Sequence, residues 1–144
     1  MAAMTPAPRH SAIVVGSVGE EQLVEGWHAR EVDGRAGIPY RAGNGRAVLV
    51  LRRQTDARRL WLLISGPVGL TGSPIEGRAH VEGRRHQLPL AVDAWVLRRY
   101  PLEPAGENLL RIELTLPEPP IPDRILGNGD VRALGWYLGA AWQE

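Results

Sequence analysis

The sequence contains no cysteine, no lysine and no phenylalanine among its 144 residues. Without cysteine, the chain can form neither disulfide bonds nor thiolate metal sites. All 17 basic residues are arginine, and they nearly balance 16 acidic residues, so the formal net charge is +1. A chain this close to neutral has no overall field that would attract nucleic acid or a membrane surface. The composition therefore predicts no nucleic-acid partner and no membrane partner.

Long hydrophobic runs are missing as well. The longest apolar runs, such as 47–51 and 60–64, fall far short of the roughly 20 residues that a membrane-spanning helix needs. The first 19 residues contain neither the basic segment nor the long apolar segment of a secretory signal. The sequence therefore predicts a cytoplasmic protein.

The length of the chain favours one domain, which can bury roughly two thirds of the surface that its unfolded chain exposes. Residues 1–11 are rich in alanine, proline and threonine, which predicts a flexible tail before a single domain at 12–144. Ser17 and Glu20 have the spacing of a capping box. This spacing predicts one short helix near residues 18–25.

From residue 26 onward, short apolar runs alternate with tight-turn signals. The turn signals are the pairs Asp33-Gly34, Asn44-Gly45, Glu82-Gly83 and Asn128-Gly129. Nine candidate strands lie between them, at 26–32, 38–41, 46–52, 59–65, 77–81, 84–90, 94–100, 108–116 and 132–142. This spacing predicts an all-β, two-sheet sandwich of about eight or nine strands with at most one short helix.

Alternation within the strands predicts which residues form the core. In 108–116, every second residue is leucine or isoleucine, while Arg111, Glu113 and Thr115 occupy the positions between them. The predicted core consists of Leu49, Leu51, Leu60, Leu62, Leu110, Ile112, Leu114, Leu134, Trp136 and Leu138.

The last predicted strand, 132–142, contains two sets of alternate residues. One set is large and apolar and comprises Leu134, Trp136, Leu138, Ala140 and Trp142. The other set contains Gly135 and Gly139. Glycines within a strand predict that another part of the protein approaches this face of the strand closely. The proline-rich segment 117–122 before this strand predicts an extended crossing between the sheets.

Polar residues near strand ends favour structural roles. Pairs of adjacent arginines recur there, at Arg52-Arg53, Arg58-Arg59, Arg84-Arg85 and Arg98-Arg99, and mostly predict solvated faces. Asp130 and Arg132 have the same parity, so in an extended strand they lie on one face. A guanidinium fork matches a carboxylate, which predicts a structural clamp at the start of the last strand.

Patterns that carry catalysis are absent from the sequence. There is no G-x-S-x-G nucleophile motif, no phosphate-binding loop and no HExxH motif. In the hairpin predicted at Glu82-Gly83, His80 and His86 point to opposite faces and cannot share a metal ion. The sequence therefore predicts no cofactor, no metal site and no catalytic residues.

The five tryptophans favour two roles. Because the chain lacks phenylalanine, at least three of the five are expected in the core. Trp27 and Trp95 have polar neighbours and are the better candidates for an exposed platform that stacks on a sugar ring, although a position in the core is still favoured for each of them.

Several short motifs together resemble a known family. They are Gly26-Trp27-His28, Pro39-Tyr40-Arg41, the run 46–51, the hairpin 79–83, a strand led by Trp95, and Asp130-Val131-Arg132-Ala133-Leu134-Gly135. This order resembles β-sandwich modules appended to bacterial glycosyltransferases and methyltransferases of surface-polysaccharide synthesis. The resemblance implies a jelly-roll-like sandwich without catalysis. The candidate binding residues are Trp27, His28, Tyr40, Arg41 and Trp95.

Three hypotheses about function remain. The first is a non-catalytic accessory module whose partner is a glycan or an enzyme of polysaccharide synthesis. The second is a module that binds a protein or a second copy of itself as a homo-oligomer. The third is an enzyme whose site the sequence does not reveal.

Overall fold

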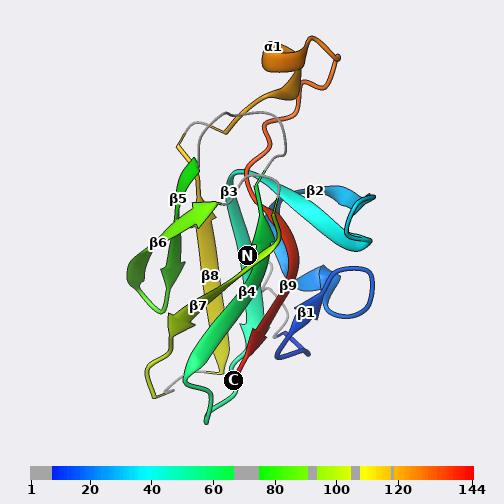
Figure 1. The fold of residues 1–144 in the computed structure, drawn as a ribbon. Coiled ribbons are helices and arrows are strands. Elements are labelled where there is room, and N and C mark those ends of the chain that lie inside the picture. Colours follow the sequence, from blue (N-terminus) through cyan, green and yellow to red (C-terminus); the bar gives the residue numbers. More distant parts are fainter. Residues whose placement is uncertain (1–7, 67–74, 91–93, 105–107, 118) are drawn as a thin grey trace, which may run out of the picture.

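A computed structural model describes residues 8–66, 75–90, 94–104, 108–117 and 119–144. These residues form nine strands, one 3-10 helix and one α-helix (Figure 1). The elements are β1 (Ile13–Val14), η1 (Glu20–Gln22), β2 (Leu23–Asp33), β3 (Ile38–Arg52), β4 (Arg59–Ser65), β5 (Ile75–Val81), β6 (Arg84–Leu90), β7 (Val96–Pro101), β8 (Leu109–Thr115), α1 (Pro122–Leu126) and β9 (Tyr137–Gln143). The prediction of an all-β sandwich with nine strands is confirmed, while the jelly-roll likeness stays a prediction.

The strands follow one antiparallel path in the order β6-β5-β8-β3-β9-β4-β7, with β1 paired to β9 and β2 to β3. In Figure 1, β4 and β7 cross in front of β3 and β8, so the path folds over into two layers. β3 belongs to both layers, because Arg46–Arg52 pairs with β8 while Arg41 and Ala42 pair with β9. The tight turn predicted at Asn44-Gly45 is therefore wrong. Strands that pass from one sheet to the other at a bend are a regular feature of sandwiches.

The predicted hairpin at Glu82-Gly83 is confirmed in its pairing. Val81 pairs with Arg84, and the pairing continues along both strands in register. Glu82 and Gly83 have φ values of 50° and 77°, and tight two-residue hairpin turns require such positive values.

The main core lies between the two layers. All ten residues predicted to form the core are buried, and the most exposed of them is Leu134 at 4%. Leu134 packs with Ala42, Tyr40 and Tyr137 in a small second cluster outside the main core.

The last strand differs from its prediction in two ways. It begins at Tyr137 and not at Arg132, and residues 131–136 have irregular structure. It also contains a β-bulge, because Leu63 pairs with Ala140 while the next residue, Ile64, pairs with Leu138. Gly139 is therefore an extra residue, and an extra residue moves the following side chains to the other face.

The bulge changes the parity that the sequence predicted for 132–142. Leu138 and Ala141 are fully buried, and Ala141 pairs with Leu62, which is also fully buried. Trp142 pairs with Trp61 and is partly exposed. The expectation that Trp142 shares a face with Leu138 is therefore wrong.

The helices also differ from expectation. The helix predicted near residues 18–25 is a single 3-10 turn at Glu20–Gln22, and β2 begins at Leu23. Pro122, expected in an extended crossing, instead begins α1, where a proline at the first position costs no hydrogen bond. Gly127 ends α1 in the left-handed conformation with φ 62°. Within the described ranges, no helix is long and apolar enough to span a membrane.

Arg53 is an exception to the predicted solvated arginine pairs. Its side chain is only 1% exposed and forms an ion pair with Glu82, with Nε 2.8 Å from Oε1. The guanidinium also donates to the carbonyls of Gln54, Ala57 and Glu103. Arg53 therefore ties the β3–β4 loop to the β5–β6 hairpin and to the segment after β7.

β6 and β7 are the two ends of the strand path, and side chains connect them. Tyr100 on β7 donates its hydroxyl hydrogen to the carbonyl of Gln87 on β6 at 3.1 Å. Arg98 donates to the carbonyl of Pro89 at 3.1 and 3.2 Å. The seam between β6 and β7 is therefore bridged by side chains.

Candidate functional site: an aromatic face

Five aromatic side chains share the outer face of the layer formed by β9, β4 and the first half of β3. They are Tyr40, Trp61, Trp95, Tyr137 and Trp142, and each is partly exposed. We call this surface the aromatic face. Cross-strand pairing explains four of the positions, because Trp61 lies opposite Trp142, and Tyr137 lies opposite Ala42, which projects to the same side as Tyr40. Trp95 immediately precedes β7.

One group of rings lies where β3 and β9 meet. Tyr40 and Tyr137 are stacked, with ring centres 4.4 Å apart and planes 19° apart. Trp95 lies 5.9 Å from Tyr40 at a tilt of 54°. Tilted and offset arrangements are those that aromatic quadrupoles favour, so these three rings form one cluster.

The second group lies further along β9. Trp61 and Trp142 are direct partners in the β4–β9 pairing, and their rings lie 6.2 Å apart and 11° from parallel. Arg99, opposite Trp61 on β7, places its guanidinium carbon 5.7 Å from the centre of the Trp61 ring. This distance allows a cation–π contact.

Gly139 lies beneath the junction of the two groups. A Cβ at this position would lie 3.1 Å from Ile38, 3.2 Å from Leu63 and 3.3 Å from Trp95. These three side chains therefore close over the backbone of the bulge. The lack of a side chain at Gly139 allows Trp95 to approach Leu63, so the aromatic face is continuous.

Polar groups border the face at the Tyr40 end. The indole N–H of Trp95 donates to Asp33 Oδ2 at 2.7 Å. The hydroxyl of Tyr40 donates to Glu31 Oε2 at 3.2 Å. Glu31 and Asp33 are two residues apart on β2, so both carboxylates project to the side of Tyr40.

Asp130 and Arg132 lie next to this border. Arg132 donates through Nε to Asp130 Oδ1 at 2.9 Å and through its NH2 nitrogen to Asp130 Oδ2 at 2.7 Å. The backbone N–H of Arg132 also donates to Asp130 Oδ1 at 3.1 Å. The same guanidinium lies 3.5 Å from Glu31. The two residues pair in the irregular segment before β9, and their role as a clamp stays a prediction.

Hydrogen bonds and burial set the charges of the ionisable side chains at the Tyr40 end of the aromatic face. The hydrogen bonds from the Arg132 side chain lower the pKa of the Asp130 carboxyl to about 2. The indole of Trp95, followed by the amide of Arg35, lowers the pKa of Asp33. Burial raises the pKa of the Tyr137 phenol to about 12. At neutral pH the aromatic face therefore presents ionised carboxylates as acceptors beside phenols that keep their protons.

The structure brings together only some of the predicted binding residues. Tyr40 and Trp95 belong to the aromatic face, whereas Trp27 packs against the main core and donates its indole N–H to the carbonyl of Val48 at 2.9 Å. His28 Nε2 lies 2.8 Å from the carbonyl of Ala133, and Arg41 donates to the carbonyl of His28 at 2.7 Å. His28 and Arg41 thus connect β2 and β3 to the segment before β9.

Sequence reasoning missed Trp61, Tyr137, Trp142 and Glu31. A signal for Trp61 was present, because Leu60, Leu62 and Ile64 form the buried set of β4 and the residues between them must face outward. The expectation that at least three tryptophans lie in the core is wrong, because Trp136 alone is fully buried.

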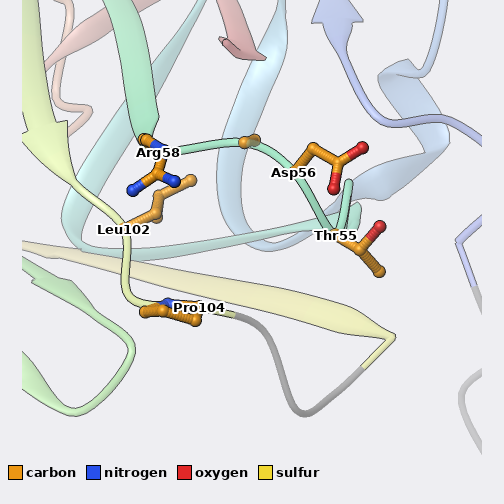
Figure 2. A pocket seen from close by; sticks show the side chains of 6 residues that line it. Thr55, Asp56, Arg58, Leu102 and Pro104 are labelled. Carbon is orange, nitrogen blue, oxygen red and sulfur yellow. The ribbon is translucent and has the colours of Figure 1, made fainter.

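A separate recess of about 360 Å³ lies at the β3–β4 loop (Figure 2). Its lining residues are Thr55, Asp56, Ala57, Arg58, Leu102 and Pro104. No aromatic ring lines it, and Figure 2 shows the Asp56 and Arg58 side chains pointing in different directions. Across the described part of the chain, no group of three histidine, aspartate or glutamate side chains could hold a metal ion.

Of the comparisons with known proteins, the one with solved structures bears on the fold. No family model matches the chain, and no curated protein matches its sequence. The chain is similar to a crystal structure of a cycloisomaltooligosaccharide glucanotransferase from Paenibacillus sp. in complex with cycloisomaltoheptaose, with a TM-score of 0.52 and 12% identity. The similarity covers 94% of this chain but 18% of that one, and at this identity it shows the fold alone.

A second solved structure, described as "CBM4 structure and function", has a TM-score of 0.43 and 8% identity. The similarity covers 92% of this chain and 86% of that one. This TM-score is too low to infer any property of the present chain from that structure.

Proposed function

We propose that the domain is a non-catalytic module that binds glycans through the aromatic face. The observation that carries the proposal is the set of five partly exposed aromatic rings, in two groups on one face, bordered at one end by carboxylates. The module would serve as an accessory to an enzyme of polysaccharide synthesis, as the family resemblance implies.

The chemistry of the face suits sugars for two reasons. The C–H face of a pyranose ring is apolar and packs well against an aromatic ring. Sugar hydroxyls are donors, and the carboxylate oxygens of Glu31 and Asp33 lie beside the rings as acceptors. Ligand sites generally combine such an apolar surface with a few well-placed polar groups.

The enzyme that shares this fold was crystallised with cycloisomaltoheptaose. That description applies to the enzyme, of which this chain covers a small part. It provides a reason to include isomalto-oligosaccharides in the first panel of ligands, together with malto- and cello-oligosaccharides.

The test compares binding of this panel to the wild type and to Trp95→Ala by titration calorimetry. We expect Trp95→Ala to weaken binding by about fivefold or more, because removal of an aromatic ring that stacks on a ligand ring typically costs about 1–3 kcal/mol. Trp27→Ala is the matched control, since this indole packs against the main core. Thermal melting verifies that both variants are folded.

Equal affinities of the wild type and a folded Trp95→Ala would contradict the proposed site. Failure of the wild type to bind any of the panel, or a broader glycan array, would contradict the proposed function.

Contact with a protein is the second candidate function, and two exposed side chains on the same face favour it. Leu97 is 51% exposed and pairs with Leu63, while Val14 is 41% exposed and pairs with Ala140. Tryptophan, tyrosine and arginine, all present here, are enriched at protein interfaces. Light scattering distinguishes self-association from glycan binding by a monomer.

A further inference from the structure

We infer that the aromatic face binds a linear oligosaccharide that runs along β9 and contacts both groups of rings, rather than a single sugar. This inference rests on the proposed function. It names the size class of the ligand, which the proposed function leaves open.

The length of the face is the first argument. Tyr137 and Trp142 project from the same face of one strand and are five residues apart. Because Gly139 is an extra residue in the bulge, the β4 partners of these two residues, Ser65 and Trp61, are four residues apart, which is about 13 Å at a rise of about 3.3 Å per residue. This span exceeds one pyranose ring, so one sugar residue cannot contact both ends.

The continuity of the face is the second argument. Trp95 and Leu63 both approach the position above Gly139, between the two groups of rings. Ala140, which pairs with Leu63, adds only a methyl group to this surface. The side chains between the ring groups, Leu63 and Ala140, are both apolar, so an extended chain can contact both groups across them.

The two ends differ in polarity, which is the third argument. The Tyr40 end carries Glu31, Asp33 and the Asp130–Arg132 pair. The Trp142 end carries stacked indoles and Arg99. Hydrogen bonds at the first end therefore fix one end of the ligand, while stacking at the second end adds affinity only when the ligand is long enough to reach it.

The experiment measures affinity against chain length in the isomalto-, malto- and cello-oligosaccharide series, from the disaccharide to the hexasaccharide. We expect affinity to rise by about tenfold or more once the ligand spans both groups, and then to level off. Trp142→Ala should remove this gain, so that the variant binds the hexasaccharide no more than about twofold more tightly than the disaccharide. Trp95→Ala should weaken binding at every length.

Trp61→Ala is a second variant at the same end, in case Trp142→Ala does not fold, and Arg111→Ala on β8 is a control away from the face. A disaccharide that binds as tightly as the hexasaccharide would overturn the inference, as would an equal loss at all lengths in Trp142→Ala. Those outcomes leave the proposed function standing. A lack of binding at every length in all three series and in the glycan array would overturn the proposed function and the inference together.

Discussion

The two faces of the β4–β9 pair are built from the same two strands but meet different requirements. On the inner face, Leu62 and Ala141 pair across the strands and are both fully buried. On the outer face, the next pair is Trp61 and Trp142, and both rings remain partly exposed. Folding alone explains the inner pair. The aromatic rings of the outer face pack against one another but stay partly exposed, and this exposure is the reason that we propose a binding role for them.

The largest expected effect comes from truncating the inner face. Leu62→Ala should lower the free energy of unfolding by about 2–5 kcal/mol, because the lost side chain leaves a cavity in a fully buried site. Chemical denaturation measures the change. Leu97→Ala, on the outer face, should change stability by no more than about 0.5 kcal/mol. Similar losses in the two variants would contradict the distinction between the faces.

An intermediate effect is expected at the β-bulge in β9, where the extra residue Gly139 changes which alternate residues face inward. Gly139→Ala would place a Cβ within 3.1–3.3 Å of Ile38, Leu63 and Trp95. We expect a loss of about 1–3 kcal/mol in stability, as for other overpacked sites, together with weaker glycan binding because Trp95 must move. Denaturation and calorimetry measure the two effects. Gly34→Ala, where a Cβ would meet no atom within 4 Å, is the control.

If Gly139→Ala binds glycan as tightly as the wild type does, the close packing of Trp95 over the bulge is not needed for the site. A stability equal to that of Gly34→Ala would show that the surrounding side chains adjust without cost.

The smallest effect concerns Asp130 at the border of the face. Its pKa is lowered in the folded protein to about 2 by Arg132, so the ionised form contributes stability above the unfolded pKa, near 3.9. That contribution should disappear as the pH falls from about 4 to about 2. Melting temperatures over this range should therefore fall more steeply for the wild type than for Asp130→Asn.

Asp130→Ala, Arg132→Ala and the double variant provide an independent check on the pair at neutral pH. Strictly additive losses, together with parallel pH profiles for the wild type and Asp130→Asn, would contradict the predicted clamp.

Local patterns were enough to predict several elements. The bounds predicted for β4 and β6, Arg59–Ser65 and Arg84–Leu90, agree with the structure. The turn before β6 contains Gly83, which has a positive φ. In β4, the buried Leu60 and Leu62 alternate with the partly exposed Trp61 and Leu63. Both signals lie within a few residues of the element that they predict.

The candidate site depended on features that lie far apart in the sequence. The outward position of Trp142 results from a bulge whose register is set by pairing with β4, about 80 residues earlier in the chain. The contact between Glu31 and Arg132 likewise joins residues from distant segments. Only two of the five rings were predicted, Trp95 from its polar neighbours and Tyr40 from the family resemblance.

The side-chain bridges across the β6–β7 seam bear on how this protein meets other molecules. An open strand edge can recruit a strand from another chain and so begin uncontrolled polymerisation. Here Pro89 offers no N–H, and Arg98 and Tyr100 already occupy two of the carbonyls on β6. The edge is therefore a poor template for strand addition, which suits a domain that, as we propose, meets its partners through the aromatic side chains.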